Sequence, residues 1–423
     1  MLSHYQMKEI PYLRILGRTN GSLEPVTLFW TASGIELNVK ATEIWVKIRS
    51  DYDVFEPWVD VIVDGVLSQR LMVNKGEQEI CLFRNMERDK VRNVKLLRDT
   101  PAFPTDEKTL LQLLEVETDG EFLPLETPKL RLEVIGDSIT SGEGGSGAGE
   151  EMTWNSFCFN AVDNYAYMAA KELGAVYNCI SQSGWGVFCS WEGNEQQAIP
   201  LYYEQVCGLL NGERNKQLGA MEKWDFQKFQ PDVIVVNLGT NDSSGTKNMD
   251  RVGKAVEDFL RKLRVCNPES YILWCYGMLG AEILPTLEKA VGNYKRKTGD
   301  ERVEFVKLPD TQEGEFGSRQ HPGHRSHEKT AKILVEKILE KLGFTPERAK
   351  AQFGFLMNAL EFGAPPMGGF ALGLDRVCML LAGADNIREV MAFPKTASGS
   401  DLMSAAPSEV TGAQLKEVSL RLL

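Results

Sequence analysis

The chain has 423 residues, which suggests two or three domains because single hydrophobic cores rarely grow beyond about 250–300 residues. Apolar residues make up 43% and charged residues 25%, as in globular proteins, and no apolar run is long enough to cross a bilayer. The formal net charge of −12 argues against nucleic-acid and anionic-membrane partners, which select clustered Lys and Arg.

The eight cysteines predict buried, reduced thiols. None forms a CxxC pair, and several lie inside apolar runs such as YILWCYGML, so neither a disulfide framework nor a zinc site is indicated. The first residues, MLSHYQMKEIPYL, lack a basic stretch followed by an apolar core, so no signal peptide is expected. We therefore expect a cytoplasmic protein.

Residues 1–125 are predicted to form a β-sandwich domain, with a jelly roll as one option. Segments rich in β-branched and aromatic residues are separated there by turn-like clusters, and WVDVIVDG alternates apolar and polar residues as a half-buried strand does. The expected strands are 26–30, 35–40, 43–48, 58–65, 78–83 and 111–118.

Residues 126–342 alternate between strand-like and helix-like segments, which predicts a parallel sheet between two layers of helices. The expected strands are 130–138, 175–181, 231–242, 271–279 and 303–309, and the expected helices are 164–174, 255–265, 284–297 and 327–343. In sheets of this kind ligands bind beyond the carboxyl ends of the strands. The chemistry should therefore lie in the loops that follow the strands.

Three polar motifs follow expected strands. Ser138 stands in GDSIT before a Gly-rich loop, Gly184 in CISQSGWGV and Asn241 in LGTND. A serine needs a base to become a nucleophile, a glycine lets a backbone N–H approach a ligand, and an asparagine amide can donate to an oxyanion. Taken singly, each also fits an ordinary local role, namely a helix N-cap, a turn glycine and an Asx turn.

A fourth motif contains three of the four histidines, in HPGHRSH. A metal cluster is the competing interpretation, but no HExxH motif or neighbouring cysteine is present, and Pro322 disfavours a helix through His321. We expect no metal and no cofactor. His321, on the loop after the last strand, is the better base, and His324 and His327 are expected to be ordinary residues of the loop and the first helical turn.

In this order the four motifs resemble the SGNH (GDSL-type) hydrolases over residues 130–342. The resemblance implies that Ser138 is the nucleophile and His321 the base. It also implies an oxyanion hole made by the backbone N–H groups of Ser138 and Gly184 and the side chain of Asn241. No GxSxG elbow occurs, which argues against an α/β-hydrolase.

The chain departs from that family at the acid, which usually lies three residues before the base histidine. Ser318 stands at this position. His321 must therefore be oriented by a backbone carbonyl, by Ser318 or by a carboxylate from elsewhere, such as Asp310, Glu313 or Glu315. We expect a Ser–His dyad.

A β-sandwich ahead of this domain resembles family 2 of the carbohydrate esterases, over about residues 15–342. The resemblance implies hydrolysis of acetyl groups from xylan-type oligosaccharides or polysaccharides. Trp185 and Trp191, beside Gly184, are candidates for stacking on a sugar ring, although buried core tryptophans are more common. The alternatives are a lipase-like or thioesterase member of the superfamily and a non-catalytic sugar-binding protein.

Residues 343–423 form a short α/β tail that resembles the C-terminal end of bacterial aspartyl-tRNA synthetases. We expect a helix over 351–363, a strand over 368–374, a helix over 375–383 and a loop over 392–412. The GLDR motif implies that Arg376 would contact ATP if the tail were functional, but Met367 replaces the usual histidine and motifs 1 and 2 are not found. We therefore expect a fused remnant without ligase activity, whose unpaired strand could drive homo-oligomerisation.

Overall fold

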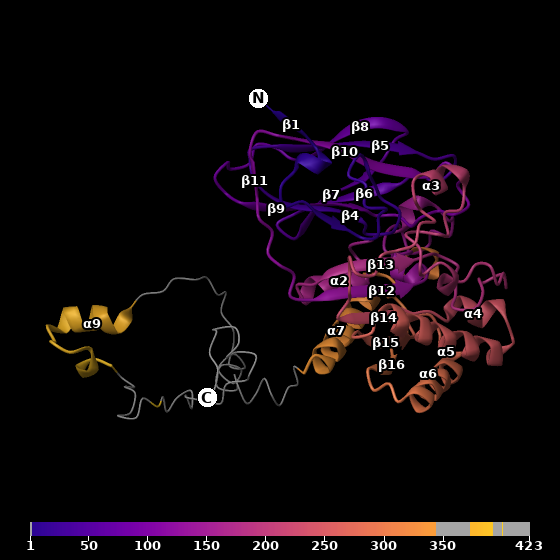
Figure 1. Cartoon of the computed structure of the whole chain (residues 1–423). Helices are drawn as coiled ribbons and strands as arrows, with labels where there is room; N and C mark the ends of the chain where they lie inside the picture. The colour runs from indigo at the N-terminus through magenta and orange to yellow at the C-terminus, as the bar shows by residue number, and fades with distance from the viewer. Residues whose placement is uncertain (1, 344–372, 392–399, 401–423) are drawn as a thin grey trace. The chain divides into compact units, whose positions relative to one another are not determined.

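The computed structural model describes residues 2–343, 373–391 and 400. Its contacts divide the chain into two compact units, residues 1–338 and 339–423. Figure 1 labels the elements of both units. In the described part of the chain, every helix is too short or too polar to cross a bilayer.

Two antiparallel sheets form the N-terminal part of the first unit, which confirms the expected sandwich (Figure 1). The first sheet has the strand order β1 (Ser3–Gln6), β10 (Leu110–Thr118), β5 (Ile44–Asp51) and β8 (Gly76–Phe83), with β3 (Val26–Thr27) also paired to β10. The second has the order β11 (Glu121–Leu123), β4 (Gly34–Lys40), β9 (Arg92–Arg98), β6 (Trp58–Val63) and β7 (Val66–Met72), with β2 (Arg14–Leu16) paired to β4. On β5, Ile44, Val46 and Ile48 point into the core between the sheets, in the period of two that the sequence shows.

A five-stranded parallel sheet follows, also as expected. Its order is β13 (Val176–Ser181), β12 (Arg131–Gly136), β14 (Val233–Asn237), β15 (Tyr271–Tyr276) and β16 (Val303–Lys307). The strand order reverses at β12. The next strand in the chain, β13, pairs with one edge of β12, and the strand after that, β14, pairs with its other edge. Such a reversal opens a crevice at the carboxyl ends of the two strands, where ligands bind in sheets of this type.

Helices cover this sheet on both sides. The helices of this part of the chain are α1 (Ser138–Ser141), α2 (Tyr165–Glu172), α3 (Glu213–Gln217), α4 (Thr240–Gly245), α5 (Met249–Cys266), α6 (Leu284–Thr298) and α7 (His324–Lys341). Of these, α3 lies beside the sandwich, where Arg214 pairs with Asp51 at 2.7 Å (Figure 1). The helices α5 and α6 pack against each other and share one hydrophobic core with β14 and β15, and α7 lies on the other side of the sheet (Figure 1). The three layers are therefore confirmed.

A buried ion pair ties the sandwich to the parallel sheet. The Arg18 guanidinium lies 3.0 Å from the Glu133 carboxylate on β12, and both side chains are 1% exposed. The same guanidinium lies over the ring of Tyr203, which also donates to Glu133 at 2.5 Å. Residues far apart in the chain thus share one polar network in the core.

The described part of the second unit contains α9 (Leu374–Ala382) and the short helix η5 (Ile387–Glu389). Leu374, expected at the end of a strand, is instead the first residue of α9. Arg376 is on α9 with its side chain exposed. Apart from Gly373, Leu374 and Ser400, the expected helix 351–363, strand 368–374 and loop 392–412 lie outside the described residues.

Candidate active site

Ser138 lies where β12 turns into a single helical turn. It is the first residue of α1, and the side chain of Asp137 caps this helix by accepting from the N–H of Ile139 at 3.0 Å. Ser138 is 5% exposed, at the carboxyl end of the strand next to the reversal in strand order. The N-cap role that we weighed for Ser138 thus belongs to its neighbour.

His321 contacts the hydroxyl of Ser138. Its Nε2 lies 2.9 Å from the Ser138 Oγ, and its Nδ1 lies 3.0 Å from the carbonyl oxygen of Arg319. Because a carbonyl can only accept, Nδ1 carries the proton, which leaves Nε2 to accept from the serine hydroxyl. This arrangement can move the serine proton to the ring.

The ring partner is therefore the backbone carbonyl, and neither Ser318 nor Asp310. The hydroxyl of Ser318 donates instead to the carbonyl of Ser146 at 2.6 Å, and Asp310 is an exposed residue. Arg319 and Gln320 have φ angles of +57° and +53°. These two left-handed residues turn the chain so that the carbonyl of Arg319 faces the ring.

A carboxylate that the sequence analysis missed, Glu143, lies near the same ring. Its Oε2 is 3.9 Å from Nε2 of His321, its Oε1 accepts from Nε of Arg319 at 2.7 Å, and it also accepts from the hydroxyl of Ser183. Glu143 is 1% exposed, although it stands in the Gly-rich loop after Ser138. Nothing in its spacing distinguishes it from a solvated loop residue.

Gly184 and Asn241 lie beside the serine turn. The Asn241 amide donates to the carbonyl of Trp185 at 2.9 Å and to the Asp137 carboxylate at 3.4 Å. Because Trp185 follows Gly184 and Asp137 precedes Ser138, these bonds join the three motifs. Gly184 has a φ of +79°, and within residues 2–343 its N–H has no acceptor. The three motifs therefore converge at one end of the sheet.

Asp242, directly after Asn241, fixes the loop that carries Gly184. Its buried carboxylate accepts from the N–H groups of Val187, Phe188 and Cys189 at 2.8, 2.7 and 3.0 Å. Burial raises the pKa of Asp242, and the three N–H donors oppose that shift. Sequence reasoning did not identify this role, although the LGTND motif contains the residue.

The carboxyl of Asp137 is poised to titrate near neutrality. Burial, together with the charges of Asp242 and Glu143 and against the hydrogen bond from Ile139, raises its pKa to about 7. The turn that carries Ser138 therefore changes charge within the range in which a histidine base also titrates.

The two candidate sugar-stacking residues differ in exposure. Trp185 is 7% exposed and packs in the main core against Tyr202, as an ordinary core tryptophan does. Trp191 is 59% exposed, and its ring lies against Gly184, where an added Cβ would be 3.1 Å from its Cδ1. Only Trp191 presents a free ring beside the serine.

The other two histidines of the HPGHRSH motif lie on α7. His327 is fully buried and accepts from the N–H of Tyr165 at 3.2 Å, and burial lowers its pKa to about 3. His324 pairs with Asp163 at 2.7 Å on the surface. His327 is in the first helical turn, as expected, whereas His324, expected on the preceding loop, is the first residue of the helix.

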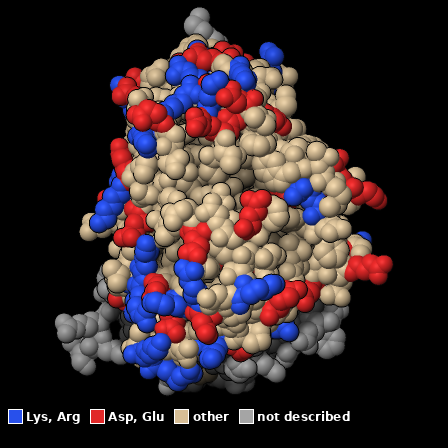
Figure 2. Space-filling model, turned by 90° about the vertical axis from the view of Figure 1, so that its right-hand side faces the viewer, with Lys and Arg blue, Asp and Glu red and all other residues tan. Residues whose placement is uncertain are grey.

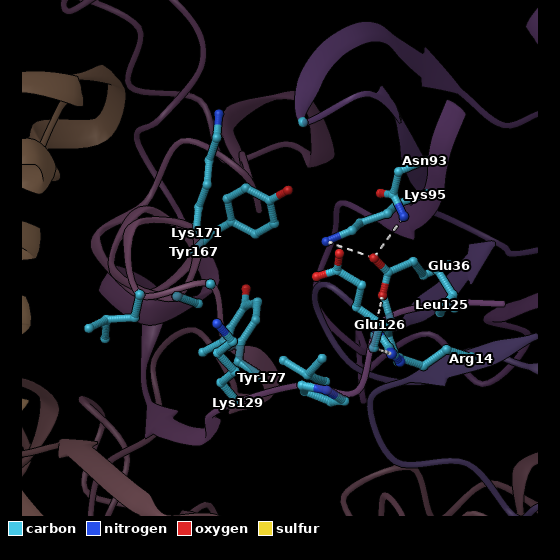
Figure 3. A pocket seen from close by; sticks show the side chains of 18 of the residues that line it. Arg14, Glu36, Asn93, Lys95, Leu125, Glu126, Lys129, Tyr167, Lys171 and Tyr177 are labelled. Carbon is cyan, nitrogen blue, oxygen red and sulfur yellow. Dashed lines mark hydrogen bonds and ion pairs between the residues drawn. The ribbon is translucent and has the colours of Figure 1, made fainter. Parts of the chain in front are cut away.

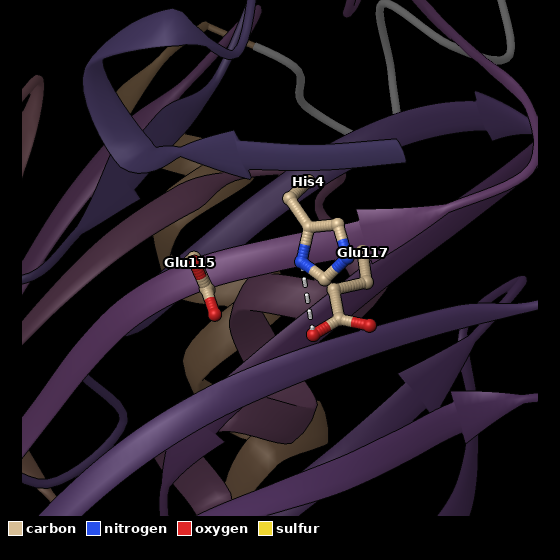
Figure 4. Close-up of side chains that lie close together, drawn as sticks. All are labelled: His4, Glu115 and Glu117. Carbon is tan, nitrogen blue, oxygen red and sulfur yellow. Dashed lines mark ion pairs between the residues drawn. The ribbon is translucent and has the colours of Figure 1, made fainter. Parts of the chain in front are cut away.

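One group of possible metal ligands occurs among the described residues, on the outer face of the sandwich. It contains His4, Glu115 and Glu117 (Figure 4). His4 is paired with Glu117 at 3.3 Å, and Glu115 accepts from Gln6 at 3.3 Å. These are ordinary cross-strand partners on β1 and β10, so we assign the group no metal.

All eight cysteines are free. Burial was predicted for all of them, but only five are buried, and Cys81, Cys266 and Cys378 are partly exposed. The face seen in Figure 2 carries both acidic and basic side chains, intermixed in several clusters, and its middle has few of either sign.

A cleft of about 720 Å³ lies between the sandwich and the segment around α2 (Figure 3). Neither Ser138 nor His321 lines it. On its sandwich side, Glu36 is already contacted by Arg14, Asn93 and Lys95. The cleft is therefore separate from the serine.

Two families match different parts of the chain. Residues 134–312 match the GDSL-like Lipase/Acylhydrolase family, and residues 323–397 match the class II tRNA synthetases (D, K and N). An acetyl xylan esterase from Butyrivibrio proteoclasticus is 39% identical, with a TM-score of 0.80 over 81% of this chain and 99% of that one. A family two carbohydrate esterase from Clostridium thermocellum, solved with cellohexaose, is 27% identical, with a TM-score of 0.70 over 79% of this chain and 100% of that one.

The C-terminal segment is similar to aspartate–tRNA ligases. That of Exiguobacterium sibiricum is 62% identical over 88 residues, which are 21% of this chain and 15% of the ligase. That of Oceanobacillus iheyensis is 57% identical over 98 residues, 23% of this chain and 16% of the ligase. The chain thus spans only 15–16% of the length of these relatives.

Proposed function

The chain belongs to the GDSL-type hydrolases, in the group of the family two carbohydrate esterases, and from that premise we propose that it removes O-acetyl groups from xylan-type carbohydrates. That it is a carboxylic ester hydrolase follows from the family itself. The observation that carries the proposal is the 2.9 Å contact between the Ser138 hydroxyl and Nε2 of His321.

Acylation begins when His321 takes the proton of Ser138 and the serine oxygen attacks the acetyl carbonyl. The oxyanion accepts from the N–H groups of Ser138 and Gly184 and from the amide of Asn241, whose long 3.4 Å hydrogen bond to Asp137 is given up for it. The bond between the acetyl carbon and the sugar oxygen then breaks, and the protonated ring gives its proton to that oxygen.

Deacylation repeats these steps with water. His321 takes a proton from the water, the resulting hydroxide attacks the acetyl-serine, and acetate leaves as Ser138 regains its proton. Throughout, the carbonyl of Arg319 holds the Nδ1 proton and keeps the ring in one tautomer. The pair works as a dyad with a main-chain third member.

Two features support an acetylated sugar as the substrate. The relative that is 39% identical is an acetyl xylan esterase, and the exposed ring of Trp191 lies beside Gly184, where a pyranose could stack. The alternative is an ester without a sugar, as a lipase-like or thioesterase member of the superfamily would cleave.

Hydrolysis of 4-nitrophenyl acetate, 4-nitrophenyl butyrate and acetylated xylo-oligosaccharides tests the proposal. We expect Ser138→Ala to lose about 10³-fold or more of kcat/KM on each substrate, and acetate to be preferred to butyrate. Full activity in Ser138→Ala would refute the nucleophile. A preference for butyrate, or failure to release acetate from the oligosaccharides, would favour the alternative substrate.

For the C-terminal segment we propose a fused remnant that does not ligate aspartate to tRNA. Aspartate-dependent exchange of pyrophosphate into ATP is the direct measurement, and a signal that Arg376→Ala abolishes would overturn this view. The cytoplasmic location and self-association through the tail stay predictions.

A further inference from the structure

Glu143 is a buried carboxylate for which the dyad mechanism has no role. It is 1% exposed, and its backbone N–H donates to the carbonyl of Ser138 at 2.9 Å, so the nucleophile turn itself carries it. A buried carboxylate is costly unless it is paired, and Arg319 pairs with one of its oxygens at 2.7 Å. The other oxygen accepts from Ser183 and lies toward His321.

The position of that second oxygen matters when the ring becomes charged. In the proposed reaction His321 receives its proton at Nε2, which lies 3.9 Å from Oε2 of Glu143. An opposite charge at this distance favours the charged form of a group, and the effect is strong where water is excluded. The usual acid of such hydrolases acts from the Nδ1 side, where the hydrogen-bond partner among the described residues is the carbonyl of Arg319.

Arg319 connects the two sides of the ring. Its carbonyl accepts from Nδ1 of His321, its N–H donates to the carbonyl of Glu151 at 2.7 Å, and its guanidinium binds Glu143 and the carbonyl of Met152 at 2.7 Å each. One residue thus fixes both the ring and the carboxylate. A pair that only stabilised the loop would need neither the carbonyl contact nor an oxygen directed at His321.

We propose that Glu143, held in place by Arg319, is the positioning residue that supplies the negative charge for the His321 imidazolium in place of the missing acid. This inference rests on the proposed function, because it assigns a partner to the base of that reaction. Two groups then take the two roles of the usual acid. The Arg319 carbonyl fixes the tautomer of His321, and Glu143 stabilises the positive charge of its imidazolium.

Other groups that titrate lie near His321 and must be separated from Glu143. Asp137 lies on the nucleophile turn, and the charge of Glu143 is one of the causes that raise its pKa to about 7, after burial. His327 faces His321 from α7, but its pKa of about 3 keeps it neutral above pH 5. A profile of activity against pH would therefore also report on Asp137, whereas the NMR signal of the His321 ring is observed at that residue.

The test is the pKa of His321, measured by NMR on the full chain with labelled histidine rings. The chain has only four histidines, so His321→Asn identifies the signal. We expect Glu143→Gln to lower the pKa of His321, and to reduce kcat up to about tenfold with little change in KM. Ser183→Ala is the matched control, because it removes a hydrogen bond to the same carboxylate but leaves its charge, and it should not move that pKa.

A second variant covers the case in which Glu143→Gln does not fold. Arg319→Asn keeps the left-handed backbone, which asparagine tolerates, and removes the guanidinium from a side chain that is 26% exposed. Glu143 then lacks its counter-charge, and we expect the pKa of His321 to rise. If neither variant moves the pKa of His321, the inference is wrong, whatever happens to activity. Loss of activity in Ser138→Ala bears separately on the proposed function.

Discussion

Replacing Gly144 with alanine should displace His321. Gly144 has a φ of +85°, and an added Cβ would lie 2.5 Å from the Cβ of His321 and 2.9 Å from the carbonyl oxygen of Ser318. Carbon atoms in ordinary contact are about 3.5 Å or more apart, so the histidine segment must retreat by about 1 Å. The left-handed backbone adds a cost of about 1–2 kcal/mol.

A shift of about 1 Å would break the 2.9 Å contact between Ser138 and His321. Misplacement of a reacting group by this amount can cost about 10²-fold, and we expect that loss in kcat/KM for 4-nitrophenyl acetate. Gly174→Ala is the matched control, because Gly174 also has a positive φ, +59°, but nothing lies within 4 Å of an added Cβ. If Gly144→Ala keeps more than a third of the activity, or if Gly174→Ala loses as much, the reasoning fails.

Three further predictions concern variants of two buried side chains and one exposed side chain. Arg18→Leu should cost about 3–5 kcal/mol in urea unfolding, because it leaves the buried Glu133 unpaired, and a cost below 1 kcal/mol would contradict this. Trp191→Ala should raise KM for acetylated xylo-oligosaccharides more than for 4-nitrophenyl acetate, and equal effects would remove the ring from the sugar site. His327 has a folded pKa of about 3 against an ordinary 6.5, so its stabilising effect is present above pH 6.5 and is lost as the pH falls. From pH 7 to pH 4 wild type should lose about 3 kcal/mol relative to His327→Asn, whose amide oxygen can still accept from Tyr165, and parallel curves would contradict this.

Most of the fold could be predicted because one physical signal, the burial of alternate or consecutive apolar residues, was strong. The segment 58–65 contains β6, but the expected exposed face was wrong, because every residue from Val59 to Val63 is buried, Asp60 included. The parallel strands β14 and β15 are continuous apolar runs, as strands covered on both faces must be. The strand β7 was missed because none of its side chains is fully buried. The strand β9 was missed because arginine and lysine alternate with its buried Val94 and Leu96.

The site residues that could be predicted from the sequence are those whose side chain or backbone suits catalysis and that also follow a predicted strand. Ser138, Gly184, Asn241 and His321 all follow strands, so the order of the sheet brings them to one edge. The ring partner could not be chosen, because it depends on two left-handed residues that no glycine marks. Glu143 was missed for a different reason, since only the folded loop shows that this polar residue is buried.

The carbonyl of Arg319 has a consequence for anyone who looks for the third member of this site. A main-chain oxygen has no side chain to delete, so alanine scanning of every acidic residue would leave the Nδ1 contact intact. It has no proton to lose, so it stays an acceptor at every pH. Only a change in the peptide itself, such as an ester in place of the amide between residues 319 and 320, would weaken this acceptor and thereby reveal it.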